Sequence, residues 1–144
     1  MLEIFQFIVA TLLADPILVG YVTVKLPNNQ TSVNIFTGPV DMSMEVQASL
    51  LYPSVILSLV SEVVRTVPQG ARDTQIQLDI WSRNSQLEID TIYEQILADL
   101  DFLTANQGSA HIFWQRLGGA VDLFESDRRV WHRSCTFTVW AIKP

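Results

Sequence analysis

The sequence predicts an α+β fold in a single domain spanning residues 1–144, with a mostly antiparallel sheet and two helices packed on it. Residues 74–82 alternate strictly between apolar and polar, which is typical of a strand with one buried face. Apolar residues within 85–103 recur every three or four positions, as in an amphipathic helix. Hydrophobic residues make up 49% of the chain and charged residues 17%, a composition that excludes a disordered protein.

Charge and cysteine content exclude further classes. Nine basic residues against fifteen acidic ones give a net charge of -6, which argues against a generally basic nucleic-acid-binding domain. The mean hydropathy of +0.25 is high for a soluble domain and suggests additional burial in an oligomer. One cysteine and two histidines do not supply the ligands of a thiolate and imidazole zinc site. We therefore expect no metal and no cofactor.

The first predicted element is a helix over residues 2–14. Its broad apolar stripe comprises Leu2, Phe5, Ile8, Val9, Leu12 and Leu13. The segment lacks a basic start, carries Glu3 and is too short to span a bilayer, so we expect neither a targeting signal nor membrane binding. We expect this helix to pack on the core, with burial against a neighbouring subunit as the alternative.

Strands are predicted next along the chain. Residues 21–26 and 31–36 are β-rich and flank a turn, which predicts a hairpin. Residues 40–51 show no clear period, and the apolar run 54–60 has the length of a strand. Residues 74–82 form the clearest strand. Its predicted inward face consists of Ile76, Leu78 and Ile80.

A second helix is predicted from residue 85 to about residue 103. Ser85 and Glu88 have the spacing of a capping box at its start. Its apolar face is formed by Ile89, Ile92, Tyr93, Ile96, Leu100 and Leu103. The acidic residues of this segment are spread around an arc and do not converge on one point, so we interpret them as a solvated face, not as a metal or acid/base site.

The last third predicts strands at 111–117, 121–125 and 128–142. The last of these carries apolar residues on both faces in places, as a central strand does. Residues 111–144 contain five cations and three acids, a net charge of +2 in an acidic protein. We hypothesise head-to-tail contacts between this basic segment and the acidic helix, with ordinary ion pairs inside the fold as the alternative. The candidate interface residues are Glu88, Glu94, Asp101, Arg128, Arg129 and Arg133.

The search for catalytic motifs finds none. The sequence has no glycine-rich phosphate loop, no CxxC, no HExxH and no GxSxG. Cys135 and His132 are three residues apart, a spacing that places them on opposite faces of a strand and prevents a thiolate pair. Asp73, Asp79 and Asp122 are interpreted as turn and surface groups. We therefore predict no catalytic residue and do not expect an enzyme.

The order of elements carries a family resemblance. Tyr52-Pro53 opens the strand Ser54-Val55-Ile56-Leu57, and the triplet Ile80-Trp81-Ser82 ends another strand that passes directly into the capped helix with Glu88. Further strands follow, with Asp122 between them. Over residues 50–142 the chain resembles the tail-completion, or tail-terminator, proteins of tailed bacteriophages.

This resemblance implies a structural virion protein without an active site. It implies a homo-hexameric ring that ends the tail tube at the head-proximal end of the tail and joins it to the head connector. The implied partners are the major tail tube protein and the head-completion or stopper protein of the connector, while genomic DNA passes through the lumen without sequence-specific binding. Such a protein is made in the host cytoplasm. The alternatives are a head-completion or stopper subunit, a minor tail protein, or an unrelated small α+β binding module.

Overall fold

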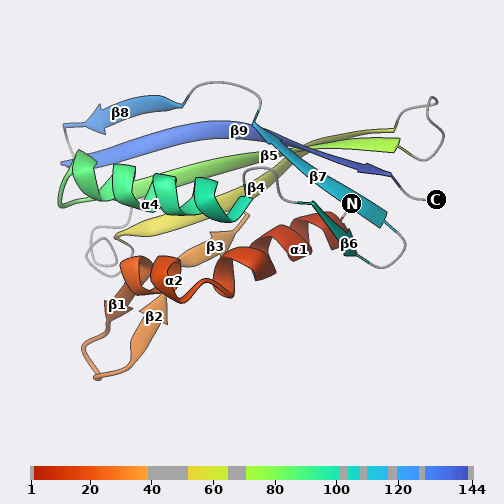
Figure 1. Cartoon of the computed structure of the whole chain (residues 1–144). Helices are drawn as coiled ribbons and strands as arrows, with labels where there is room; N and C mark the ends of the chain where they lie inside the picture. The colour runs from red at the N-terminus through yellow and green to blue at the C-terminus, as the bar shows by residue number, and fades with distance from the viewer. Residues whose placement is uncertain are drawn as a thin grey trace.

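The computed structural model contains a seven-stranded mixed sheet, a separate two-stranded hairpin and helices packed on the sheet (Figure 1). The residues it describes are 2–38, 52–64, 71–100, 104–107, 110–116, 120–126 and 129–142. The described helices are α1 (Leu2–Leu13), α2 (Pro16–Val22) and α4 (Gln86–Leu100). The strands are β1 (Thr23–Lys25), β2 (Thr31–Val33), β3 (Ile35–Thr37), β4 (Ser54–Val64), β5 (Ala71–Ser82), β6 (Thr104–Gln107), β7 (Ala110–Arg116), β8 (Val121–Glu125) and β9 (Val130–Ile142).

Strand β9 lies at the centre of the sheet, as predicted. The strand order is β3-β4-β5-β9-β7-β6. On one side β9 pairs with β5 along almost its whole length, and on the other side its two halves pair with β8 and β7. All of these pairs are antiparallel except β3 with β4, which are parallel. The predicted α+β fold with a mostly antiparallel sheet is thus confirmed.

One face of the sheet packs against all three described helices. On β5 the predicted inward residues Ile76, Leu78 and Ile80 are fully buried. They meet Phe137 of β9 and the apolar face of α4, on which Ile92 is also fully buried. The period of two in the strands and the period of 3.6 in the helix place these side chains in one core.

The N-terminal region differs from the prediction. Helix α1 forms as expected, but Tyr21 and Val22 belong to a second helix, α2, and not to the hairpin. Asp15 caps α2 by accepting a hydrogen bond from the amide of Ile17 at 2.9 Å, and Pro16 occupies the first helical position. An Asp-Pro pair is a strong helix-start signal, because proline has no amide to leave unpaired there.

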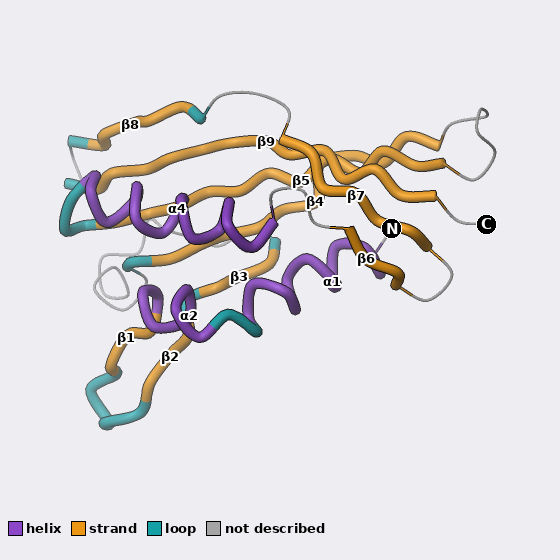
Figure 2. The backbone as a smooth tube through the Cα atoms, in the orientation of Figure 1, coloured by secondary structure: helices purple, strands orange, loops and turns teal. Residues whose placement is uncertain are grey.

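The predicted hairpin forms, but it is shorter than expected. Strands β1 and β2 pair with each other and extend away from the main sheet (Figure 2). Residues 35 and 36, expected in the hairpin, instead start β3 and pair with β4. Among the described residues no single helix is long and apolar enough to cross a membrane. Phe5–Leu13 and Pro16–Val22 reach that composition only as a pair bent by 84°.

Helix α4 begins where predicted, with half of the expected capping box. The amide of Glu88 donates to the hydroxyl of Ser85 at 3.1 Å. The carboxylate of Glu88 does not reach back to Ser85, and instead accepts from Ser82 Oγ at 2.7 Å and Asn84 Nδ2 at 2.9 Å. The helix is described to Leu100, and the expected continuation to 103 lies outside the described residues. Strand β6 was not predicted.

On the other face of the sheet, Asp79 belongs to a cluster of polar and aromatic side chains and is not exposed as expected. The Asp79 carboxylate lies 2.8 Å from His132 Nε2, and both side chains are 13% exposed. The His132 ring stacks on Trp81 with ring centroids 3.8 Å apart. Burial alone would raise the pKa of Asp79, but hydrogen bonds with His132, Ser134 and Gln77 lower it. The prediction of a surface carboxylate at position 79 was wrong. Asp79 contacts His132 of the neighbouring strand β9, and most of its side chain is buried.

Two carboxyl groups join the start of α2 to the end of α4. Asp15 and Asp99 are hydrogen-bonded to each other, and Gln95 Nε2 donates to Asp15 Oδ2 at 2.7 Å. Burial, then the hydrogen bond and the charge of Asp15, raise the pKa of Asp99 to about 7. With a pKa of about 7, Asp99 is partly protonated at neutral pH, so the two carboxyl groups share a proton at this helix junction only part of the time.

We expect replacement of Leu78 by Asp to lower the free energy of unfolding by several kcal/mol, because it buries an unpaired carboxylate in the core. Soluble yield and the urea midpoint measure this loss. Thr136→Asp is the matched control, since Thr136 lies half-exposed on the opposite face of the sheet. Equal midpoints for the two variants would contradict the assignment of the buried face.

We expect thermal stability to fall between about pH 4 and pH 7, because folded Asp99 retains a proton that the unfolded chain releases near its ordinary pKa of 3.8. Above that window the loss is complete. Asp99→Asn mimics the protonated form, so its melting temperature should exceed that of the parent at pH 8 and match it near pH 4. If the melting temperatures of the parent and of Asp99→Asn differed by the same amount at every pH in this range, the shared proton would be absent.

Candidate assembly interface

Arg133 joins three elements of the fold. Arg133 lies near the start of β9. Its guanidinium contacts Asp122 of β8, Nε to Oδ1 at 2.6 Å, and Asp90 of α4, Nη2 to Oδ1 at 2.5 Å. It also lies over the ring of Tyr93, 4.9 Å from the ring centroid. Gln86 Nε2 donates to Asp122 Oδ2 at 2.7 Å, a second link from α4 to β8. These contacts position β8 against the first turns of α4.

The electrostatics of this cluster are those of a fixed ion pair. The hydrogen bond with Arg133 lowers the pKa of Asp122 against a smaller opposing effect of burial. The hydrogen bond with Asp122 raises the pKa of Arg133, although burial opposes it. Asp122 is thus a surface carboxylate with an internal partner. For Arg133 the structure shows the alternative of the sequence analysis, an ion pair inside the fold, and only 11% of its side chain is exposed.

Beside this cluster lies an apolar edge, which we call the β8 surface. Val121, Leu123 and Phe124 are 58%, 51% and 52% exposed, and in the described part of the chain no strand pairs with the outer edge of β8. Phe124 shares one face with Trp131, their rings 4.8 Å apart, while Val121 and Leu123 point to the other face. Exposed apolar edges of this kind are sites at which another chain adds.

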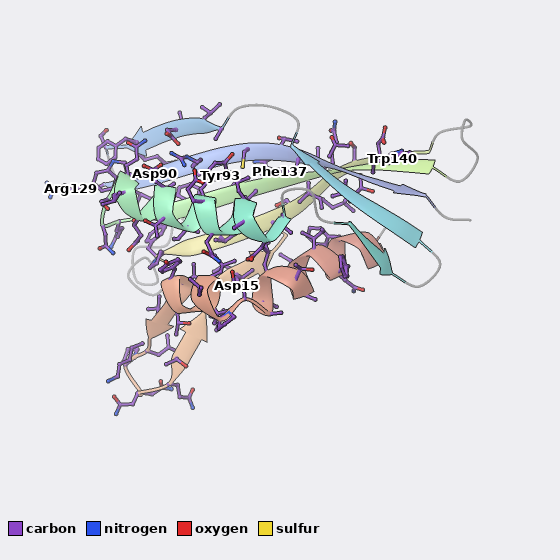
Figure 3. The ribbon with its side chains drawn as sticks, viewed as in Figure 1. Asp15, Asp90, Tyr93, Arg129, Phe137 and Trp140 are labelled. Atoms are coloured by element: carbon purple, nitrogen blue, oxygen red, sulfur yellow. The ribbon has the colours of Figure 1, made fainter. Side chains whose placement is uncertain are left out.

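Arg129 completes the β8 surface. It lies exposed in the turn before β9, with a positive φ of 54°. In Figure 3 it projects from the end of the molecule at which α4 begins. No ion pair to Arg129 occurs among the described residues, in contrast to Arg133. The β8 surface therefore combines apolar side chains with the exposed cation of Arg129, next to the carboxylate of Asp122, which is paired with Arg133.

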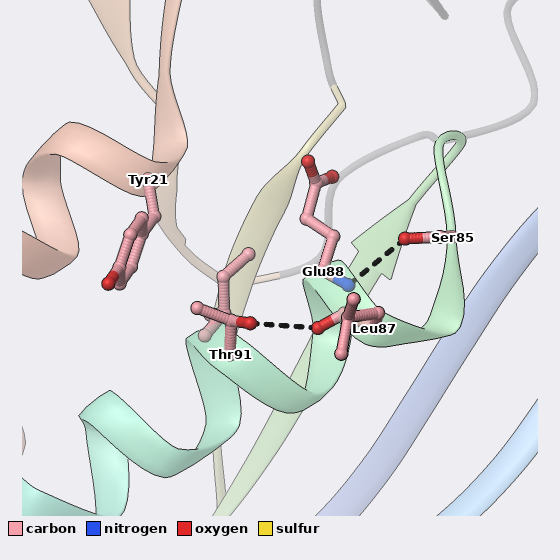
Figure 4. A pocket seen from close by; sticks show the side chains of 6 residues that line it. Tyr21, Ser85, Leu87, Glu88 and Thr91 are labelled. Carbon is pink, nitrogen blue, oxygen red and sulfur yellow. Dashed lines mark hydrogen bonds between the residues drawn. The ribbon is translucent and has the colours of Figure 1, made fainter.

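A second exposed surface lies between α2 and α4, and we call it the α2–α4 groove. Its volume is about 300 Å³, and Figure 4 shows the side chains of Tyr21, Ser85, Leu87, Glu88, Thr91 and Ile92 that line it. Leu87 is 72% exposed at its rim. Glu94 lies exposed on the same helical stripe as Leu87 and Thr91. The groove therefore combines apolar side chains with the bonded carboxylate of Glu88, and the exposed Glu94 lies further along the same helix.

The predicted site residues are thus distributed over both surfaces. Glu88 and Glu94 belong to α4 at the groove, and Arg129 belongs to the β8 surface. Asp101 and Arg128 lie outside the described residues. The sequence analysis missed the exposed apolar residues beside these charges. Leu87 lies off the predicted apolar face of its helix, and β8 has apolar residues at both odd and even positions, which are the signals that could have found them.

In the part of the chain that the structure describes, no three histidine, cysteine, aspartate or glutamate side chains lie close enough to hold a metal ion. Cys135 is buried, and its thiol contacts the carbonyl oxygen of Leu78 at 3.6 Å. The described surfaces offer shape, apolar area and charge, which are the properties of a protein contact.

We expect Arg133→Ala to lower the free energy of unfolding of the monomer by about 2 kcal/mol, because it leaves Asp90 and Asp122 without their shared cation. Arg129→Ala removes an exposed arginine of the same strand end and should leave the unfolding free energy unchanged within about 0.5 kcal/mol. Urea unfolding of both variants tests the contrast. A loss for Arg129→Ala equal to that of Arg133→Ala would mean that Arg129 also has an internal partner.

Comparison with known proteins identifies the family. The fold is similar to that of a chain in the virion of a native gene transfer agent (GTA) particle, with a TM-score of 0.63 and 10% sequence identity, covering 94% of this chain and 91% of that one. None of the curated proteins matches the sequence. The model of the family described as tail completion protein gp17 matches residues 28–142. Because this match spans well over half of the sequence, the chain belongs to the tail completion protein gp17 family.

Proposed function

We propose that this protein is a structural, non-enzymatic subunit that forms a homo-hexameric ring at the head-proximal end of a phage tail. The observation that carries the proposal is the presence of two separate apolar surfaces, the α2–α4 groove and the β8 surface, with the exposed Glu94 beside the first and the exposed Arg129, unpaired among the described residues, beside the second. Membership in the tail completion family and a fold similar to that of a GTA virion chain support a place in a tail.

The two surfaces suit a cyclic assembly. In a ring every contact is heterologous, so each subunit needs two unlike and complementary patches. We infer that Leu123 and Phe124 of one subunit pack against Tyr21 and Leu87 of the next. Arg129 then faces Glu94 across the same contact. Glu88, Asp101 and Arg128 are the remaining candidates for its charged rim.

The same proposal assigns the partners of the ring. One rim of the ring rests on the major tail tube protein, and the other meets the head-completion or stopper protein of the connector. Genomic DNA crosses the lumen without sequence-specific binding. The acidic net charge of -6 fits this last point, because a protein that does not hold DNA has no need of a basic surface.

Charge reversal across the contact tests the proposal. We expect Arg129→Glu and Glu94→Arg each to shift the protein towards monomer, because each places like charges together, while the double variant restores assembly. Lys25→Glu is the matched control, since Lys25 is exposed on β1, outside both surfaces. Leu87→Asp should abolish assembly without changing the unfolding midpoint of the monomer, because Leu87 is already exposed.

Light scattering over a concentration series, and electron microscopy of tails with the protein labelled, provide the measurements. The expected particle is a hexamer of the 16.3 kDa chain at the head-proximal end of the tail. Monomer at every concentration together with absence from purified tails would contradict the ring. Label at the opposite end of the tail would contradict the head-proximal position.

A further inference from the structure

The face of the sheet opposite the helices carries three rows of side chains that run across β4, β5 and β9. Cross-strand partners share a face, so the pairing register defines each row. The rows are Ser61, Gln75 and Thr138, then Ser58, Gln77 and Thr136, then Ile56, Asp79 and Ser134. Seven of these nine side chains are uncharged hydroxyl or amide groups, and all seven are half-buried. We call these seven residues the polar rows.

Side-chain hydrogen bonds connect several members of the polar rows. Ser61 Oγ donates to Gln75 Oε1 at 3.1 Å across β4 and β5. Gln77 Nε2 donates to both Asp79 oxygens along β5 and to Ser134 Oγ of β9. Asp79, the single carboxylate in the three rows, is 2.8 Å from His132 and mostly buried. The centre of this face is thus polar and hydrogen-bonded, and its acidic group is already partnered.

Exposed charges lie elsewhere on the molecule. The described lysine, arginine and glutamate side chains that are exposed are Lys25, Arg83, Glu94 and Arg129, and none belongs to the polar rows. The outer surfaces of soluble assemblies ordinarily rely on such charges to stay in solution. The polar rows, which are bordered on the same face by apolar side chains such as Ile56 and Val121, instead suit water-filled space that the outer surface does not share.

We infer that the polar rows line the lumen of the proposed ring and face double-stranded DNA in transit. This inference rests on the proposed function and adds to it the face of the subunit that DNA passes. Hydroxyl and amide groups offer neutral, short-lived hydrogen bonds to phosphate oxygens. They release no counterions, and counterion release is what makes cationic surfaces hold DNA. With Asp79 paired to His132 as their single carboxylate, these rows do not repel the phosphates either.

Thiol labelling of assembled tails tests which way this face points. Thr136→Cys places a thiol of similar size in the middle row, and the parent is a suitable background because Cys135 is buried. We expect the new thiol to react with N-ethylmaleimide but not with a maleimide carried on a globular protein too large for the lumen. Asn28→Cys, at the exposed tip of the β1–β2 hairpin, is the control and should react with both reagents.

A charge insertion gives an independent readout. Thr136→Arg adds one cation per subunit to the polar rows, so its ring should retain a double-stranded DNA fragment at low salt at least about tenfold better than the parent, and release it as salt rises. Asn28→Arg adds the same charge at the hairpin tip and should not have this effect.

The outcomes separate the two proposals. If parent tails carry no ring, the proposed function fails and the lumen assignment fails with it. If the ring forms and the Thr136→Cys thiol reacts with the bulky reagent, or with neither reagent, then the lumen assignment alone is overturned. Equal DNA retention by the two arginine variants in intact rings would also overturn it.

Discussion

The structure depends on the one-sided burial of the β5–β9 pair. Because these strands are long and fully paired, their alternation places Leu78 and Phe137 under the helices along the whole sheet. The described helices dock on this face, which carries the larger of the two apolar clusters. The opposite face carries polar side chains such as Gln77 and Thr136, together with the smaller apolar cluster around Ile56. A shift of one residue in this pairing would exchange the two faces, so the register decides both the core and the surface.

Arg133 extends this constraint from the core to the assembly surface. The aliphatic part of the Arg133 side chain belongs to the buried face of β9. The guanidinium lies at the edge of that face, where it pairs with Asp90 and Asp122. A short edge strand such as β8 has few backbone bonds of its own, so two charge-assisted contacts to Asp122 determine its place against α4. Arg133, which the sequence analysis named as a candidate for contact with a neighbouring subunit, thus forms ion pairs inside its own subunit. These ion pairs hold β8 in position, and the apolar edge of β8 remains exposed.

Elements with a strong period could be predicted from the sequence, and elements that depend on tertiary contacts could not. The alternation of Ile76, Leu78 and Ile80 and the helical spacing of Ile89, Ile92 and Ile96 are local signals, and the structure confirms them. Helix α2 is short, and its apolar residues look equally β-like until Asp15 and Pro16 are read as a helix start. Asp79 contacts His132, and Arg133 contacts Asp90, across more than forty residues of the chain, so no local pattern marks these two contacts. For the same reason the sequence did not distinguish Arg129, which is exposed, from Arg133, which is paired.

The charged residues assigned to the proposed ring contact contribute little to its affinity. An exposed charge pair is worth about 0.2 to 1 kcal/mol, so burial of the apolar residues must supply most of the affinity. We expect two subunits alone to associate weakly. A closed ring has no free ends, so it contains one contact for every subunit. A tail end that binds every subunit also raises the effective concentration of the subunits to about the millimolar range. Under the proposed function, contacts of this strength give an equilibrium between monomer and hexamer in solution, and the end of a tail tube shifts that equilibrium towards the closed ring.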